Sequence, residues 1–332
     1  MKRKLAFLLM LCFGWSFFLN GCGGTLPKTD DRLQVVCTIF PEYDWARQLT
    51  QGVDNVDLTL LVKNGTDLHS YQPSVRDIAM IARADVFCYV GGVSDTWVND
   101  VLDTTENRTA QLVSMAEAAD ADEEVLAEGM QAEHEHEHEH DHHDDESDSH
   151  EEPPELDEHV WLSLRRAALA CTAMKDALCK ADPAHEDIYN QNCTDYLQKL
   201  QELDSDFTEM TSQAARDTIV VADRFPFRYL AEDYGLTYYA AFPGCSAETE
   251  ASFETIVFLS EKVESLHLPC VLVTEGSNSS LAKTILENAG SDGKILTLQS
   301  LQAVSQKEID TGVTYLSKMQ ENYDVLKQAL NS

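Results

Sequence analysis

Short apolar runs rich in Val, Ile and Phe alternate with stretches of helical periodicity along most of the chain. The apolar runs predict buried strands at 33–40, 56–62, 85–90, 218–222, 236–242, 270–274 and 294–298. Helical spacing predicts helices between them at 43–51, 74–84, 251–263 and 280–289. Because alternating strands and helices favour parallel sheets, and the pattern occurs before residue 116 and again after residue 216, we expect an α/β protein of two lobes. Each lobe should be a mostly parallel sheet flanked by helices.

A long amphipathic helix is expected between the two lobes, at 183–213. Asp182 followed by Pro183 has the order of an N-cap and a first helical residue. Apolar residues then recur at spacings of mostly three and four, which places them on one face: Ile188, Tyr189, Cys193, Tyr196, Leu197, Leu200, Leu203, Phe207 and Met210. At 1.5 Å per residue this helix would be roughly 45 Å long. We therefore expect an N-terminal lobe at 32–182 and a C-terminal lobe at 214–332 that move only slightly against each other.

The N-terminus has the features of an export signal. Three basic residues at 2–4 precede an apolar run at 5–19, which is too short for a full membrane span. The run ends in Leu19-Asn20-Gly21-Cys22, which resembles a bacterial lipobox, whose Cys takes a diacylglyceryl group. We expect a signal peptide at 1–21, lipidation of Cys22 and a short tether at 22–31. The protein would then be anchored by lipid at the extracytoplasmic face of the bacterial cytoplasmic membrane.

Acidic residues dominate the charge of the chain. The 332 residues include 58 Asp and Glu against 24 Lys and Arg, for a formal net charge of −34. This excess excludes a basic groove for nucleic acid and favours cations as ligands. Twenty of the acidic residues lie between 117 and 158, where apolar residues are few. We expect a disordered loop at 117–156 within the N-terminal lobe.

Histidine alternates with acid inside that loop. Its seven histidines are His134, His136, His138, His140, His142, His143 and His150. Neutral imidazoles and carboxylates at high local concentration bind Zn²⁺, Ni²⁺ or Cu²⁺ in many interchangeable arrangements. The pattern predicts a loop that collects metal with low affinity.

Cysteine usage gives no sulfur-ligated metal motif. Cys12 belongs to the export signal, which leaves Cys22 for lipidation and seven others: Cys37, Cys88, Cys171, Cys179, Cys193, Cys245 and Cys270. No C-x-x-C pair occurs, and several lie in apolar runs where free Cys packs as a small hydrophobe. We expect mostly buried thiols.

Two histidines outside the loop are candidates for a fixed metal site. His69 lies in a loop that leaves a buried strand, and His159 lies between the acidic stretch and a new helix. By contrast, His185 and His267 occur in positions typical of surface residues. A pair of histidines beside a metal-collecting loop favours ligation by His69 and His159.

The stretches around these histidines carry a family resemblance. Three stretches resemble the zinc and manganese receptors of bacterial ABC importers, in particular the zinc-receptor branch. They are residues 65–73, with Gly-Thr-Asp-Leu-His-Ser-Tyr-Gln-Pro, residues 157–162, with Asp-Glu-His-Val-Trp-Leu, and the opening at 38–44. The resemblance covers nearly the whole mature chain. It implies two lobes on a rigid helix with the metal between them, and it matches His69 and His159 to the first two histidine ligands.

The chain departs from the family at the third ligand. Arg224 stands where the family has His or Glu, and a guanidinium cannot ligate a cation. Asp223, one residue earlier, and Glu275, which sits where the family has an acidic residue, remain as candidates. We expect carboxylates of the C-terminal lobe, from Asp223 or Glu275 or both, to complete the site across the cleft.

The resemblance implies a receptor that captures Zn(II) outside the cell and delivers it to a membrane ABC permease driven by a separate ATPase. Two imidazoles with carboxylates favour Zn²⁺ over Mn²⁺ by the Irving–Williams order. A manganese receptor of the same type is the first alternative. A secreted zinc hydrolase or an adhesin is the alternative from another class, although we find no placed general base for a hydrolase. We expect no enzymatic activity.

Overall fold

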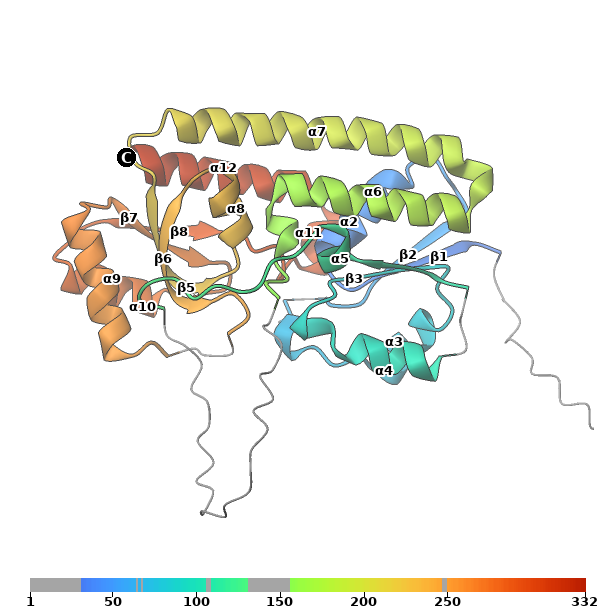
Figure 1. The fold of residues 1–332 in the computed structure, drawn as a ribbon, viewed down its shortest axis with the longest axis horizontal. Helices are drawn as coiled ribbons and strands as arrows, with labels where there is room; N and C mark the ends of the chain where they lie inside the picture. Colours follow the sequence, from blue (N-terminus) through green and yellow to red (C-terminus); the bar gives the residue numbers. More distant parts are fainter. Residues whose placement is uncertain (1–30, 64, 67, 106–108, 131–155, 247–249) are drawn as a thin grey trace, which may run out of the picture. The chain divides into compact units, whose positions relative to one another are not determined.

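A four-stranded parallel sheet forms the centre of each half of the protein (Figure 1). The structure is a computed structural model, and it describes residues 31–63, 65–66, 68–105, 109–130, 156–246 and 250–332. The strand order is β2-β1-β3-β4 in the first sheet and β6-β5-β7-β8 in the second. The predicted α/β fold of two parallel-sheet lobes is therefore confirmed.

The first sheet consists of β1 (Leu33–Cys37), β2 (Val56–Leu60), β3 (Val86–Tyr89) and β4 (Gln111–Ser114). The helical elements around it are α2 (Phe40–Leu49), η1 (Leu68–Ser70), α3 (Val75–Ile81), η2 (Val93–Asp95), α4 (Trp97–Thr104) and α5 (Met115–Ala118). Helix α2 begins three residues before the predicted start at 43, because the Glu42 carboxylate accepts the backbone N–H of Thr38 at 2.7 Å and caps the first turn.

The second sheet consists of β5 (Thr218–Phe225), β6 (Thr237–Pro243), β7 (Cys270–Thr274) and β8 (Lys294–Leu298). The helices that follow its strands are α8 (Arg228–Asp233), α9 (Phe253–Ser265), α10 (Ser280–Asn288) and α11 (Gln306–Asp310). Its core is built from β-branched and aromatic strand residues such as Val220 and Phe242, packed against Leu259 of α9.

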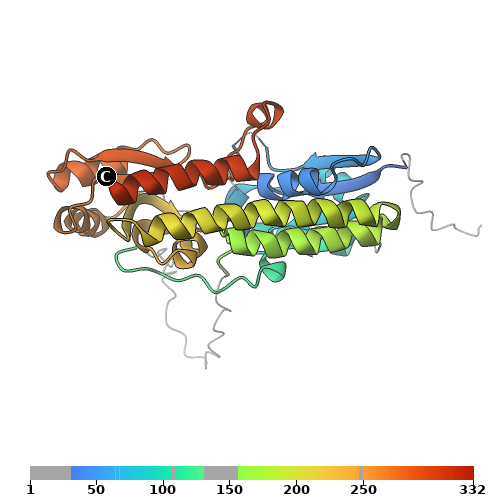
Figure 2. The ribbon, with the colours of Figure 1, turned by 90° about the horizontal axis from the view of Figure 1, so that it is seen from above.

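Three long helices lie side by side along the protein (Figure 2). They are α6 (Leu164–Ala181), α7 (Glu186–Ser212) and α12 (Tyr315–Asn331), and the short turn η4 (Pro183–His185) separates α6 from α7. Helix α7 buries the face that its sequence predicts, including Tyr189, Leu200 and Phe207. Its 27 residues correspond to roughly 40 Å. This is the predicted long helix between the sheets, which begins as η4 at Pro183.

Direct hydrogen bonds also join the two halves. The Trp161 indole N–H donates to the Ser300 carbonyl at 2.8 Å, and the Tyr315 hydroxyl donates to the Trp161 carbonyl at 2.6 Å. Arg47 donates to the Val313 carbonyl at 2.8 Å. These contacts lie far from α7 in sequence, so the halves are held together by more than the linking helix.

Part of the expected acidic loop is ordered. Residues 117–130 belong to the described fold, and Glu123 pairs with Leu156 in an antiparallel bridge. The prediction of disorder over all of 117–156 is therefore wrong for these residues. The seven loop histidines and the expected signal peptide with Cys22 lie outside the described residues. Within the described ranges, no helix has the length and apolar character needed to cross a membrane.

Candidate metal site

His69 and His159 approach the same point from two different loops. His69 is the central residue of η1, and the fully buried Leu68 beside it anchors that turn. His159 directly precedes η3 (Val160–Leu162), where Trp161 is completely buried. The centroids of the two imidazole rings are 5.5 Å apart. The structure thus brings together the two histidines that the sequence selected as ligands.

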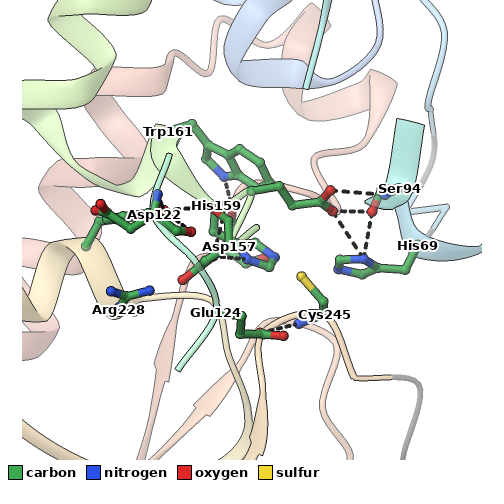
Figure 3. A network of polar contacts seen from close by, with 12 residues as sticks. His69, Ser94, Asp122, Glu124, Asp157, His159, Trp161, Arg228 and Cys245 are labelled. Carbon is green, nitrogen blue, oxygen red and sulfur yellow. Dashed lines mark hydrogen bonds and ion pairs between the residues drawn. The ribbon is translucent and has the colours of Figure 1, made fainter. Parts of the chain in front are cut away.

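The His159 ring is fixed by the carboxylate of Asp157. The distance between His159 Nδ1 and Asp157 Oδ1 is 2.9 Å, and the same oxygen accepts the His159 backbone N–H at 3.1 Å (Figure 3). A neutral imidazole that donates from Nδ1 has its lone pair on Nε2. His159 is 0% exposed, and its Nε2 has no hydrogen-bond partner among the described residues. A buried nitrogen without a partner is costly unless a ligand binds it.

Competing effects act on the protonation of His159. Burial lowers the pKa of His159, whereas the hydrogen bond and negative charge of Asp157, together with the charge of Glu158, raise it. The net pKa lies above its ordinary value. The negative charge of these carboxylates therefore favours a positive charge at the ring. Either a proton or a bound cation can supply that positive charge.

His69 is held by a second buried carboxylate, that of Glu158. The distance from His69 Nδ1 to Glu158 Oε1 is 3.3 Å, and the Ser94 hydroxyl lies 2.7 Å from the same nitrogen. Glu158 is 0% exposed and accepts the backbone N–H of Ser94 at 3.0 Å. Burial raises the pKa of Glu158. A Cβ on Gly92 would lie only 2.2 Å from Glu158 Oε2, so glycine is required at position 92 for this packing.

Cys245 comes to this cluster from the other half of the protein. It follows β6, and the turn passes so close to His159 that a Cβ on Gly244 would lie 2.9 Å from His159 Nδ1. In the part of the chain that the structure describes, one group of at least three potential ligand atoms gathers within 4.8 Å, and it consists of His69, Glu158 and Cys245. Figure 3 shows the sulfur facing both imidazole rings. Burial, followed by the charge of Glu158, raises the pKa of the Cys245 thiol.

A segment from the first half reaches the Cys245 turn as well. We call residues 119–130 the strap. Its Asp122 N–H donates to the Tyr229 hydroxyl at 2.9 Å, and its Glu124 accepts the backbone N–H of Cys245 at 3.3 Å. The strap therefore positions the cysteine turn and adds a carboxylate beside the cluster (Figure 3).

Asp223 and Glu275 lie together but apart from that group of three. Asp223 accepts the Thr274 hydroxyl at 2.8 Å, and Glu275 accepts the Ser300 hydroxyl at 2.7 Å and the Ser300 N–H at 2.6 Å. Burial raises the pKa of Glu275. Both carboxylates line a cavity of about 400 Å³, whose other lining residues include Gly65, Thr66 and Gly244. The structure thus places the two carboxylates near the loops that carry His69 and Cys245.

Sequence reasoning missed Glu158 and Cys245. The signal for Glu158 is the acidic pair Asp157-Glu158 directly before His159, which is typical of a charged site. Cys245 was grouped with the buried thiols, and all seven cysteines at 37–270 are indeed free, five of them buried. The useful signal was its position in a Pro-Gly turn directly after a parallel strand, where ligand sites lie in α/β folds.

Comparison with known proteins gives a consistent assignment. Residues 35–329 match the family model described as "ZnuA: Zinc-uptake complex component A periplasmic". The chain is 32% identical over 328 residues to the zinc-binding lipoprotein AdcA of Streptococcus pneumoniae, covering 99% of this chain but 61% of that protein. It therefore spans about three fifths of the length of this relative.

Two further comparisons cover the matched proteins almost completely. The chain is 30% identical to the high-affinity zinc uptake system protein ZnuA of Bacillus subtilis, over 98% of this chain and 96% of that one. The Zn(II)-bound ZnuA-like domain of Streptococcus pneumoniae AdcA matches with a TM-score of 0.69 at 29% identity, over 91% of this chain and all of that domain. The model match, the two relatives and the shared fold together show that the chain belongs to the ZnuA family of zinc-uptake components.

Proposed function

We propose that the protein is an extracytoplasmic receptor that captures Zn²⁺ and delivers it to a membrane ABC permease with a separate ATPase. The observation that carries the proposal is the buried His159 Nε2, which lacks a partner among the described residues and belongs to a ring 5.5 Å from that of His69. Orientation of a metal-binding imidazole by a carboxylate, as Asp157 orients His159, is usual in zinc sites. No chemical step is assigned to this protein.

The donor set favours zinc over manganese. Imidazole nitrogens suit Zn²⁺, and for such ligands the Irving–Williams order places Zn²⁺ above Mn²⁺. The relatives agree with this preference, since AdcA is named a zinc-binding lipoprotein and ZnuA a high-affinity zinc uptake system protein. Carboxylates complete the set, with Glu158 already beside His69 and with Asp223 and Glu275 as the acids expected from the other half.

Release to a permease would require only a small rearrangement. The hydrogen bonds of Trp161 to Ser300 and Tyr315 and the packing of α7 against both α6 and α12 oppose a wide opening of the two halves. We propose local movement of η1, because the His69 side chain is 12% exposed whereas that of His159 is 0% exposed.

We also propose lipid anchoring at Cys22 and low-affinity metal collection by the seven loop histidines. The lipobox-like Leu19-Asn20-Gly21-Cys22 supports the anchor, and the name of the relative AdcA contains the word lipoprotein. For the loop, the support is its point of attachment. Leu156 pairs with Glu123, and the Asp157 N–H donates to the Asp122 carbonyl at 2.9 Å, so the chain that follows the histidine-rich segment joins the fold directly before His159.

A zinc titration of the full chain tests the receptor function. Competition against a chelating dye should reveal one tight site together with several weak ones. His69→Ala and His159→Ala should each abolish the tight phase and leave the weak phase. The matched control is His267→Asn, because His267 is exposed with φ of 50°, a conformation that Asn tolerates. A tight phase that persists in both alanine variants would overturn the assignment.

A further inference from the structure

Arg224 of the second half cannot ligate a cation, and its Nη1 lies 3.5 Å from the Ser246 carbonyl. Asp223 and Glu275 are hydrogen-bonded to Thr274 and Ser300 within their own half. His69, His159 and Glu158 are therefore all contributed by the first half, and the ion needs a donor from the second.

We infer that Cys245 supplies this donor and binds the zinc ion through its Sγ as a thiolate. The inference rests on the proposed function, since it names a ligand of the same site. Two observations that do not depend on each other support it. The sulfur lies within 4.8 Å of ligand atoms of His69 and Glu158 and faces the His159 ring (Figure 3), whose buried Nε2 has no partner among the residues that the structure describes.

The backbone of the turn fits this role. Gly244 leaves room for the chain to pass against the His159 ring, where a side chain would collide with it. Glu124 of the strap accepts the Cys245 N–H and holds the turn in place. Both contacts bring Cys245 to the histidines, and neither involves its sulfur.

The distances allow coordination after a small local closure. Zn–S bonds of about 2.3 Å and Zn–N bonds of about 2.0–2.1 Å place sulfur and nitrogen roughly 3.6 Å apart in a tetrahedral site. Since the ligand atoms of His69, Glu158 and Cys245 lie within 4.8 Å of one another, an approach of about 1 Å brings these three within bonding distance of one ion.

The charges of the direct ligands match that of the ion. A thiolate from Cys245 and a carboxylate from Glu158 give two negative charges, and two neutral imidazoles give none. The carboxylates of Asp157 and Glu124 contact the His159 ring and the Cys245 N–H and are not counted among these ligands. The thiol proton leaves to solvent when the ion binds. A thiolate is a soft ligand, so this set discriminates against Mn²⁺ more strongly than an oxygen in the same place.

Cobalt substitution of the full chain tests the inference directly. Co²⁺ bound by a thiolate gives a charge-transfer band in the near ultraviolet, which the loop histidines cannot produce. We expect this band in the wild type and in Cys179→Ser, the control cysteine, which is only partly buried and lies on α6. We expect its loss in Cys245→Ser, whereas Cys245→His should lose the band but retain tight zinc binding.

The outcomes separate this inference from the proposed function. A Cys245→Ser variant that binds zinc at least tenfold more weakly and lacks the band supports the thiolate. A wild type with tight zinc binding but without the band, or a band that survives in Cys245→Ser, overturns the thiolate and leaves the receptor intact. Failure of the wild type to bind zinc tightly would instead overturn the receptor. Circular dichroism of each variant shows whether it folds.

Discussion

Substitution of Gly244 by alanine provides a steric probe of the metal site. The added Cβ would lie 2.9 Å from Nδ1 and Cε1 of His159 and 3.2 Å from the Phe225 carbonyl oxygen. Ordinary carbon contacts are about 3.5–4.0 Å, so the overlap with the ring is at least roughly 0.6 Å. Without metal, only the hydrogen bond to Asp157 and the packing around the ring resist a shift. A bound ion would hold Nε2 as well, so the clash acts more strongly on the bound state.

The expected magnitude follows from the cost of overpacking. Inserting a methyl group into a packed site costs about 1–3 kcal/mol, which corresponds to a factor of about 5 to 150 in Kd. Competitive zinc titration of Gly244→Ala should therefore show a Kd raised within that range. Gly235→Ala is the control, because its φ of 65° strains an alanine while no atom of the described residues outside its chain neighbours lies within 4 Å of the new Cβ. That variant should lower the Tm without changing the Kd. Equal zinc affinity in Gly244→Ala and the wild type would refute the placement of His159 in the site.

Three other predictions concern the support of the site, the loop and the pH dependence of stability. Asp157→Ala removes the acceptor that orients His159 and should weaken zinc binding about 10- to 100-fold in the same titration, an effect that an unchanged Kd would contradict. Deletion of residues 131–155 should remove the weak phase of the zinc titration and leave the tight phase, and loss of the tight phase would contradict this. In the intact chain, the weak phase should fade as the pH falls through about 6.5, because imidazole must be neutral to bind the ion. Burial, followed by the charge of Asp95, raises the pKa of Glu42 from 4.5 to about 8. The folded state therefore binds the proton more tightly than the unfolded state, and the free energy of unfolding falls as the pH rises between these two values. Urea unfolding of Glu42→Gln should show a smaller fall in the free energy of unfolding across that interval, and an unchanged slope would contradict the assignment.

The fold was largely predictable because its strands and long helices carry strong local patterns. Runs such as Val56–Leu60 and Cys270–Thr274 are β-branched and bounded by polar turns, and the apolar face of α7 has unbroken helical spacing. Strand β4 was missed because it has only four residues, Gln111–Ser114, with polar residues at both ends. The strap was missed for a different reason. Its acidic sequence resembles a solvated run, and the contacts that order it, such as the one to Tyr229, come from the other half of the protein.

The histidine pair was predictable from local motifs, whereas the side chains that the fold brings beside it were not. His69 and His159 stand in stretches that resemble a known family. Cys245 approaches them only because β6, a parallel strand of the second sheet, ends beside His159. No local sequence pattern predicts this tertiary contact. Likewise, Glu158 becomes a candidate only when η2 brings Ser94 against it and buries it. Tertiary contacts, and not composition, distinguish these two side chains from the other cysteines and acids of the chain.

The most direct test of the account is a crystal structure of the zinc-loaded protein with anomalous data collected at the zinc edge. We expect one strong peak about 2.0–2.1 Å from a ring nitrogen of His69 and from His159 Nε2. We also expect a sulfur from Cys245 at about 2.3 Å, with Glu158, Asp223 or Glu275 completing the shell. A zinc ion bound elsewhere in the fold, with His159 Nε2 still unligated, would contradict the central claim that this histidine pair is the receptor site.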